Sequence, residues 1–410
     1  MAEAETDFCI VGGGPAGLTL ALLLVRSGAR VVLVERSRSL DREYRGEILQ
    51  PGGMALLDQM GVLGPARERG CHEHDRFLLV DRGRVLIDAN YRRLPEPFNC
   101  LLSIPQRHIL EELLAACQGY DEFTLIAGNK VTDLMRNGDR VLGVMSDGLA
   151  GAQTVRAHCV VAADGRYSKV RRLAGISDGR LDIFTQDILW FKLPARGEAP
   201  REVRIFRAAG NPVIAYASVP DRIQIGWTLP HKRYHDVADK GIEYIKDQVS
   251  SAIPLYAALI RSHITDLKDL TLLDVFAGCA ETWVRDGLVL IGDSAHTHSP
   301  IGAQGVNLAI QDAVALHPVL LASLQQRDAS SEFLGQYESL RKKAIAKIMK
   351  IQVLQSRLML ATDGFAALAR SRVASVVSRT PAYNKILRQL AFGDQAIQVP
   401  DRSRTTGVVP

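Results

Sequence analysis

The residues most able to do chemistry lie in one short stretch, GDSAHTHSPIGAQGVN, at positions 292–307. Asp293, His296 and His298 could supply ligands to a metal ion, whereas Asp293, Ser294 and His296 could form part of a hydrolase site. A third interpretation gives the chemistry to the glycine-rich tail, because glycines let a ligand approach the backbone closely. The rest of the chain decides between these three.

Neither side-chain interpretation is well supported. A metal ion needs three or four converging ligands, and alternate positions on one loop supply at most about two of them. A nucleophilic serine needs the strained elbow of a GxSxG motif, and GDSAH is not one. The sequence therefore predicts no metal site. We interpret His296 as a packing or supporting residue, and His298 as a packing residue that could face a substrate pocket.

A second glycine turn lies near the start of the chain, in DFCIVGGGPAGLTLALLLVRSGARVVLVER. The pattern predicts a strand at 8–11, a helix at about 15–27 and a second buried strand, RVVLVE. The turn reads GxGxxG, in which successive glycines permit a tight turn, close approach of a pyrophosphate, and packing of helix on strand. The helix N-terminus would bind the pyrophosphate, and Glu35 would accept hydrogen bonds from ribose hydroxyls. The unit predicts a dinucleotide site, for either NAD or FAD.

Two further strands end at small or acidic residues. CVVAADGRYSKVRRLAG predicts a strand that ends at Asp164 and Gly165, with Ser168 and Arg171 on the following turn. GLVLIGDSAHTHSPIGAQGVNLAIQDAVAL predicts another strand that ends at Gly292, followed by a loop and an apolar helix. Three strand-to-loop junctions can therefore converge on one ligand.

This ordered set of motifs, which spans residues 8–312, resembles the single-component FAD-dependent aromatic hydroxylases. These are the class A flavoprotein monooxygenases, typified by para-hydroxybenzoate hydroxylase and the ubiquinone-pathway hydroxylases. YRGEILQPGG and IPQRHIL add an arginine and a glutamine beside the cofactor and an arginine at its ribityl or phosphate portion. The cofactor-binding residues that the motifs and the resemblance indicate are Gly12, Gly14, Pro15, Ala16, Gly17, Glu35, Arg36, Arg45, Gln50, Arg107, Asp164, Gly292, Asp293, Pro300, Gly302, Gly305, Val306 and Asn307.

The glycine-rich tail fits the flavin end of such a site. A reduced flavin carries negative charge near N1 and C2=O, and a helix that begins near Gly302 points its positive end at that charge. Gly302 and Gly305 let the backbone come close. By the same resemblance, Asp293 takes the ribitol hydroxyls and Pro300 lies beside the reactive edge of the ring.

The resemblance implies an NAD(P)H-driven monooxygenase. In this family NADPH or NADH reduces FAD, O2 adds at flavin C4a, and the hydroperoxide attacks an electron-rich carbon of an aromatic substrate, here a phenolic, quinolone or polycyclic one. The protein binds, orients and excludes water. A base could activate the substrate, and Tyr216, His231 and His298 are candidates that the sequence does not rank.

Three alternatives remain open. A flavin-dependent halogenase would carry a Trp-x-Trp-x-Ile-Pro element, and QIGWTLP has only Trp227. A prenyl reductase would carry an aromatic-x-Trp-x-Phe-Pro element, of which residues 225–230 are a degraded version, so reduction of a lipid-like substrate stays possible. A non-catalytic FAD-binding protein is the third.

The elements that position these residues predict an α/β fold. A Rossmann-like FAD-binding domain is expected to be discontinuous, over 1–75, 100–180 and 275–330. Alternating apolar and polar residues with regular turn signals predict an antiparallel β-sheet at 181–230 and helices at 239–266, so that 76–99 and 181–274 form a substrate domain. Residues 331–410 are expected to form C-terminal helices, with breaks at Gly364 and Pro381.

Composition sets the outer limits. The chain has 410 residues, 47% of them hydrophobic, and six scattered cysteines with no CxxC pair, which together predict a cytoplasmic globular protein without a disulfide framework. The first residues do not resemble a secretion signal. The net charge of +5 makes no case for nucleic acid.

Residues 341–388, however, hold eleven Lys or Arg and one acidic residue, a net +10 that leaves −5 for the remainder. Their apolar stripe predicts packing on the fold, with peripheral contact to an anionic membrane as the alternative. The oligomeric state is left open.

Overall fold

The strand before the first glycine turn is the centre of an eight-stranded, mostly parallel sheet. The computed structural model describes residues 2–40, 47–207, 211–359, 380–393 and 397–400. β1 (Ala2–Val11) pairs in parallel with β2 (Val31–Glu35) on one side and β11 (Gln153–Ala162) on the other. β1 starts earlier than the sequence predicts, because its first residues pair with residues 153–157. All of β2 is buried, as expected for a parallel strand covered on both faces.

The path of this sheet runs β19-β20-β11-β1-β2-β8, with β10 and β9 added beside β11. Its other strands are β8 (Phe123–Ala127), β9 (Asn129–Asn137), β10 (Arg140–Gly148), β19 (Val284–Arg285) and β20 (Leu288–Leu290). Three chain-distant strands, β1, β11 and β20, therefore end at one edge, so the three predicted strand-to-loop junctions meet.

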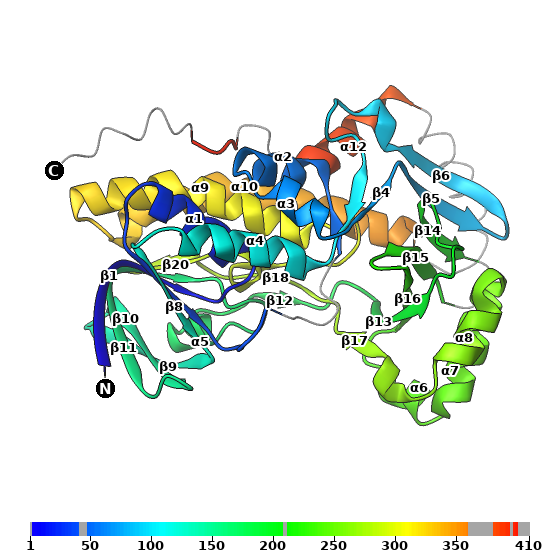
Figure 1. Ribbon diagram of the computed structural model, residues 1–410, viewed down its shortest axis with the longest axis horizontal. Helices are drawn as coiled ribbons and strands as arrows, with labels where there is room; N and C mark the ends of the chain where they lie inside the picture. Colours follow the sequence, from blue (N-terminus) through cyan, green and yellow to red (C-terminus); the bar gives the residue numbers. More distant parts are fainter. Residues whose placement is uncertain (1, 41–46, 208–210, 360–379, 394–396, 401–410) are drawn as a thin grey trace.

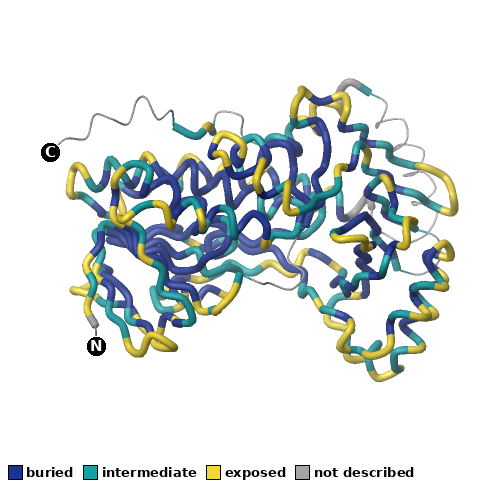
Figure 2. The backbone as a smooth tube through the Cα atoms, viewed as in Figure 1, coloured by how far each residue is buried: buried dark blue, intermediate teal, exposed yellow. Residues whose placement is uncertain are grey.

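Helices α1 (Pro15–Arg26), α4 (Gln106–Gln118) and α9 (Gly305–Gln326) cover one face of this sheet, with α1 between the other two (Figure 1). Every residue of α1 from 16 to 25 is buried, and the tube in Figure 2 is mostly dark blue, for buried, where α1, α9 and the sheet meet. Among the described residues, α9 alone is long and apolar enough to cross a membrane, but 67% of its most apolar window is buried in the protein. Burial of this kind is typical of a core helix.

A second, seven-stranded sheet is built from two separate parts of the chain, residues 76–90 and 186–273, and has the order β17-β13-β16-β15-β14-β5-β6. Its strands are β5 (Arg76–Asp81), β6 (Arg84–Asn90), β13 (Gln186–Pro194), β14 (Val203–Arg207), β15 (Val213–Ser218), β16 (Arg222–Pro230) and β17 (Thr271–Leu273). Helices α7 (Gly241–Ala252) and α8 (Ala257–His263) cover its outer face (Figure 1). On the opposite, inner face, Val203 and Tyr216 pack in a cluster with Leu387 and Ala391 of the C-terminal part of the chain.

The C-terminal helix α10 (Ser331–Met359) packs along α9. Its apolar residues Ile345 and Ile348 are buried in the main core, while Lys343, Lys347 and Lys350 are exposed. The described part of the apolar stripe therefore packs on the fold. α12 (Pro381–Phe392) lies beside α2 and begins at the predicted Pro381. Residues 360–379, with the predicted break at Gly364, lie outside the described residues.

The remaining elements are two small three-stranded sheets, β3-β7-β4 and β12-β18-β21, together with short helices and turns. They are α2 (Pro51–Gln59), α3 (Leu63–Glu68), α5 (Lys169–Leu173), α6 (Tyr234–Ala238), β3 (Ile48–Leu49), β4 (His72–His74), β7 (Leu101–Ser103), β12 (Arg180–Leu181), β18 (Ala277–Cys279), β21 (His296–Thr297) and the 3-10 turns η1 (Tyr91–Arg93), η2 (Pro254–Tyr256), η3 (Leu267–Asp269) and η4 (Gly292–Ser294).

Candidate functional site

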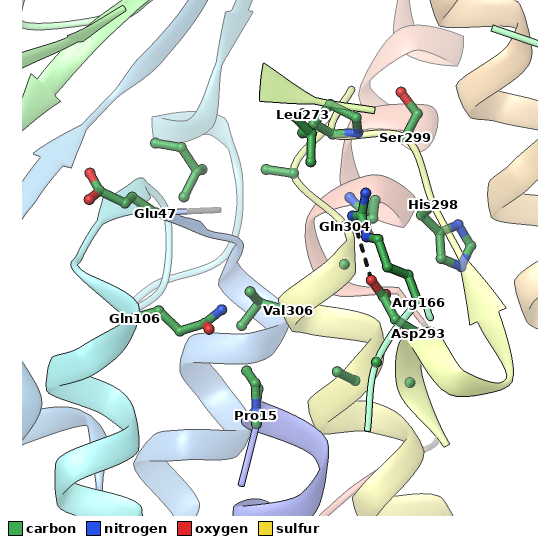
Figure 3. A pocket seen from close by; sticks show the side chains of 18 of the residues that line it. Pro15, Glu47, Gln106, Arg166, Leu273, Asp293, His298, Ser299, Gln304 and Val306 are labelled. Carbon is green, nitrogen blue, oxygen red and sulfur yellow. Dashed lines mark ion pairs between the residues drawn. The ribbon is translucent and has the colours of Figure 1, made fainter. Parts of the chain in front are cut away.

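A cavity of about 1430 Å³ runs from the glycine turn of the α/β unit to the inner face of the seven-stranded sheet. A pocket for one small ligand is usually about 300–1,000 Å³, so this cavity has room for a cofactor and a substrate together. Figure 3 shows its two kinds of wall, with Pro15 at the start of α1 and Val306 at the start of α9 on one side and Glu47 toward the sheet.

The glycine turn forms a backbone cradle at one end of the cavity. Gly12 has φ +107°, and a Cβ there would lie 2.5 Å from the carbonyl oxygen of Ala163. A Cβ on Gly17 would lie 2.0 Å from the carbonyl oxygen of Gly12, so a glycine is needed for α1 to pack this closely. Gly14 caps α1 with no side-chain hydrogen bond, which leaves the first N–H groups of the helix for a ligand. This donor set fits the pyrophosphate of a dinucleotide.

Glu35 lies at the end of β2 and lines the cavity, as predicted. Its carboxylate also fixes the turn, because Oε2 accepts from the Gly13 N–H at 2.6 Å and Oε1 accepts from the Ser37 N–H at 2.8 Å. Contact between Glu35 and a ribose stays a prediction.

Asp164 lines the cavity and also starts helix α5. Its carboxylate accepts from the Ser168 hydroxyl at 2.5 Å and from the Lys169 N–H at 2.7 Å. Burial raises the pKa of this carboxyl, while these hydrogen bonds act in the opposite direction. Arg171, on the same helix, is buried and donates to the carbonyl oxygen of Ser294 at 2.8 Å. The second and third predicted junctions are therefore tied together directly.

Asp293 faces the cavity at the end of β20. Its carboxylate forms an ion pair with Arg166, at 3.6 Å between Nη2 and Oδ2 (Figure 3). The Arg166 guanidinium also donates to the carbonyl oxygen of Asp274 and lies 5.7 Å from the centre of the Phe276 ring. Arg166 places a positive charge on this wall of the cavity. The sequence did not single it out.

The loop from 299 to 305 is held by amide side chains. Gln50 donates to the carbonyl oxygen of Gly302 at 2.9 Å, and Gln304 donates to the same oxygen at 2.9 Å. Asn307 accepts from the Gln50 N–H at 3.0 Å and donates to the carbonyl oxygen of Ala303 at 2.8 Å. Asn307 therefore braces the loop through both ends of its amide.

A buried polar chain continues from this loop into the core. His298 contacts His296, with 2.9 Å between Nε2 and Nδ1, and His296 contacts Asp312, with 2.6 Å between Nε2 and Oδ2. Arg341 donates to Asp312 Oδ1 at 2.8 Å. At the other end, His298 Nδ1 lies 3.1 Å from Oε1 of Gln352. None of the five residues in this hydrogen-bonded network is more than 5% exposed.

The three candidate bases have different surroundings. Tyr216 lines the cavity, and burial together with the charge of Glu47 raises the pKa of its hydroxyl well above the ordinary value. Burial and the neighbouring His296 lower the pKa of His298 to about 3, and both of its ring nitrogens have partners. His231 does not line the cavity, because its ring binds Asp187 at 2.7 Å at the end of β16. None of the three therefore combines a place at the cavity with a pKa suited to a base at neutral pH.

Most of the predicted cofactor residues line the cavity: Gly12, Gly14, Pro15, Ala16, Glu35, Arg36, Gln50, Asp164, Gly292, Asp293, Pro300, Gly302, Gly305 and Val306. Gly17 and Asn307 do not line the cavity but contact residues that do, Gly12 and Ala303 respectively. The guanidinium of Arg107 forms an ion pair with Glu111 at 3.6 Å, and Gln106 rather than Arg107 is among the residues that line the cavity. Contact between Arg107 and the cofactor stays a prediction. Arg45 lies outside the described residues.

The inner face of the seven-stranded sheet forms the other end of the cavity. Period-two alternation places Gln224 and Thr228 of β16 on this face, with Tyr216 of β15 directly opposite Gln224. Trp190 of β13 also lines the cavity, and its ring lies over Gly226. Trp227 points to the opposite face, where it packs in the cluster formed with α7 and α8. The degraded tryptophan element is therefore core packing, which removes the observation that kept the reductase alternative open.

Comparison with known proteins gives concordant results. The family model described as FAD binding domain matches residues 5–352. The chain is 59% identical over 396 residues to the 6-methylpretetramide 4-monooxygenase of Streptomyces rimosus, covering 97% of this chain and 94% of that one. Among solved structures, p-nitrophenol 4-monooxygenase PnpA from Pseudomonas putida DLL-E4 superposes with a TM-score of 0.81 at 19% identity, covering 96% and 100% of the two chains. Anhydrotetracycline hydroxylase OxyS from Streptomyces rimosus superposes with a TM-score of 0.77 at 23% identity, covering 97% and 77%.

Proposed function

Because this chain belongs to the FAD-binding domain family and is an FAD-dependent monooxygenase of aromatic substrates, we propose that it hydroxylates a fused polycyclic aromatic polyketide. The observation that carries the proposal is 59% identity, over nearly the full length of both chains, to a 6-methylpretetramide 4-monooxygenase. The volume of the cavity, about 1430 Å³, supports a substrate larger than a simple phenol.

The residues of the α/β end fit FAD. The glycine cradle and the start of α1 would hold the pyrophosphate, Glu35 the ribose of the nucleotide half, and Asp293 the ribitol chain. Bound FAD, with a reduced nicotinamide and O2, supplies the oxidising chemistry. The chain itself binds and orients the ring system and keeps water from it, through the loop at 299–305 and the buried sheet face.

The sheet end offers one donor and one acceptor to a substrate. The Tyr216 hydroxyl has no hydrogen-bond partner among the described residues, and its raised pKa keeps it protonated and able to donate. The Oε1 atom of Gln224 is buried without a partner in the described part of the chain, while its Nε2 donates to the carbonyl oxygen of Phe191 at 3.3 Å. An unpaired buried carbonyl costs about 1–3 kcal/mol, which a bound ligand can recover. A ring with adjacent carbonyl and hydroxyl groups matches this pair.

Substrate identity is tested by offering purified holoprotein 6-methylpretetramide, simple phenols, quinolones and other polycyclic phenols with NADPH or NADH. The proposal expects hydroxylated product, with one oxygen atom from labelled O2, from a polycyclic phenol, and little coupled oxidation with monocyclic phenols. Efficient hydroxylation of a monocyclic phenol with no turnover of any polycyclic compound would overturn the polyketide assignment while leaving the monooxygenase assignment intact.

Variants test the sheet end. Tyr216→Phe and Gln224→Leu should each raise KM for the substrate about tenfold, because each loses one hydrogen bond in a dry site. Thr228→Val is the matched control, since the Thr228 hydroxyl lines the same face but already donates to the carbonyl oxygen of Pro212 at 2.9 Å. Equal effects from all three variants would show that the pair has no specific role.

A further inference from the structure

The buried polar chain allows its protons to be counted from hydrogen-bond roles. The amide nitrogen of Gln352 donates to two backbone carbonyls, those of Ser299 at 3.0 Å and Ile301 at 2.9 Å. Carbonyl oxygens only accept, so this amide orientation is fixed and Oε1 of Gln352 must be the acceptor toward His298. His298 therefore carries a proton on Nδ1.

The count continues through the second histidine. Three contacts in a row need a proton each: His298 to Gln352, His296 to His298, and His296 to Asp312. Two neutral imidazoles supply only two protons. Asp312, His296 and His298 together therefore hold one proton more than a carboxylate and two neutral rings would hold, whichever of the three groups carries it.

Two observations place this extra proton on His296. Asp312 also accepts from the N–H of Gly292 at 3.0 Å and from Arg341 at 2.8 Å, and hydrogen bonds of this kind favour the ionised carboxylate. The His296 ring also lies 5.0 Å from the ring of Trp283, within reach of a cation–π contact. His296 is therefore the imidazolium, and His298 is neutral.

The network carries a net charge of +1, because Arg341 and the His296 imidazolium are two cations and Asp312 is one anion. Asp312 balances either Arg341 or the imidazolium, but not both, and Nη1 of Arg341 is buried without a partner among the described residues. The acidic groups nearby have cations of their own, since Asp293 pairs with Arg166 and Glu338 pairs with Lys342. A buried net charge of +1 is costly unless an anion comes close to it.

The cavity wall is where an anion can come close. His298 and the loop residues Ser299, Pro300, Ile301 and Gly302 all line the cavity, and Figure 3 labels His298 and Ser299 among them. Gln352 ties this loop to His298 through its hydrogen bonds. We propose that the network formed by Arg341, Asp312, His296 and His298 is a buried cationic cluster that favours the reduced, anionic form of the bound flavin over the oxidised form. The inference rests on FAD binding and is independent of which aromatic compound is hydroxylated. In this arrangement His298 is a positioning residue.

The test compares two replacements of His298 in the holoprotein. His298→Gln can still accept from His296 and donate to Gln352, so it should keep the extra proton. His298→Leu removes the acceptor, so His296 should lose that proton. The reduction potential of bound FAD, measured by equilibration with reference dyes, should fall in His298→Leu by about 30 mV or more, which for a two-electron couple is a tenfold loss of preference for reduced flavin. In His298→Gln it should stay within a third of that change.

His317→Gln is the matched control. His317 is also buried, but its Nε2 contacts Ser27 at 2.9 Å, the Ser27 hydroxyl donates to the carbonyl oxygen of Leu23, and Nδ1 has no partner among the described residues. The same counting makes His317 neutral, so its replacement should leave the potential unchanged. Equal shifts in His298→Leu and His298→Gln, or no shift in either, would overturn the proposal.

A second measurement counts the ring protons in the wild-type protein itself, and variants serve only to assign its signals. Nitrogen-15 NMR of ring-labelled histidines in the wild-type protein should show three ring N–H protons on the His296–His298 pair at neutral pH. Assignment uses His298→Gln and His317→Gln. A pair with only two ring protons would refute the imidazolium and the cationic cluster, even if hydroxylase activity were intact.

Discussion

Replacing Gly17 by alanine should release FAD, because the added methyl group has no room. Its Cβ would lie 2.0 Å from the carbonyl oxygen of Gly12, whereas ordinary contacts begin at 3.4 Å. The start of α1 must therefore move by about 1.4 Å from the turn that carries the pyrophosphate. A displacement of about 1 Å at a binding site commonly costs about a hundredfold, or about 2.7 kcal/mol, and overpacking costs about 1–3 kcal/mol of folding stability.

Gly13→Ala, four residues before Gly17 in the same glycine turn, is the matched control. Its Cβ would meet Oε2 of Glu35 at 3.3 Å, and that atom is the end of a side chain able to shift by a few tenths of an ångström. We expect Gly17→Ala to purify almost colourless, with a Kd for FAD about a hundredfold weaker by fluorescence titration, while Gly13→Ala stays within about fivefold of wild type. Circular dichroism of the two apoproteins separates loss of the site from loss of the fold. If Gly17→Ala binds FAD as tightly as Gly13→Ala, the close approach of helix and turn is not what forms the site.

Three further outcomes follow from single contacts. Burial lowers the pKa of His317 from 6.5 to about 4, so the unfolded chain binds a proton that the fold excludes, and stability is lost as pH falls from 6.5 toward 4. Between pH 7.5 and pH 5, the free energy of unfolding measured in urea should fall by about 2 kcal/mol more in wild type than in His317→Gln. An equal fall in both proteins would contradict burial of a neutral ring. Gly226→Ala places a Cβ 2.6 Å from the Trp190 ring and should push that ring into the cavity, which raises KM for the substrate at least tenfold with FAD content unchanged. Because Ile348 is buried, the protein should not co-float with anionic liposomes at low salt, and flotation that salt abolishes would contradict packing of the stripe.

The sequence could predict which residues gather at the α/β end of the cavity because that end is built from local backbone patterns. A strand, a glycine turn and a helix follow one another within about twenty residues, so the order of residue types alone was enough to expect Gly12, Gly14 and Glu35 at the cavity, where they lie. Their convergence with Gly292 and Asp293 followed from parallel strands ending at one edge.

Side-chain roles were harder to predict, because a motif letter does not say which way its residue points. Asn307 belongs to the glycine-rich run, but its amide binds protein groups, accepting from the N–H of Gln50 and donating to the carbonyl oxygen of Ala303. Arg341 was counted only as one of the eleven basic residues at 341–388, and it is fully buried against Asp312. One signal was available for Arg341: it precedes Ile345 and Ile348 by four and seven residues, which places it on the buried stripe of its own helix.

Strand alternation also held more information than the tryptophan element drawn from it. In RIQIGWTLP the apolar positions 223, 225, 227 and 229 share one face, and Gln224, Gly226 and Thr228 share the other. An antiparallel sheet with one covered face turns its apolar set toward the covering helices, so Trp227 belonged to the core and Gln224 to the open side. Long-range partners such as Glu47, which accepts from Lys192 and Ser218 more than a hundred residues away, had no local signal.

The two ends of the cavity consequently differ in how much their chemistry depends on side-chain identity. The cofactor end presents mainly backbone N–H groups, glycines and a helix terminus, so few substitutions there are compatible with any bound dinucleotide. The sheet end presents side chains on alternate positions of β13, β15 and β16, each replaceable without moving the strand that carries it. Changes at Trp190, Tyr216 or Gln224 should therefore alter which aromatic is bound while FAD binding persists. The same separation explains how solved structures at about 20% identity share this fold although their names give different substrates.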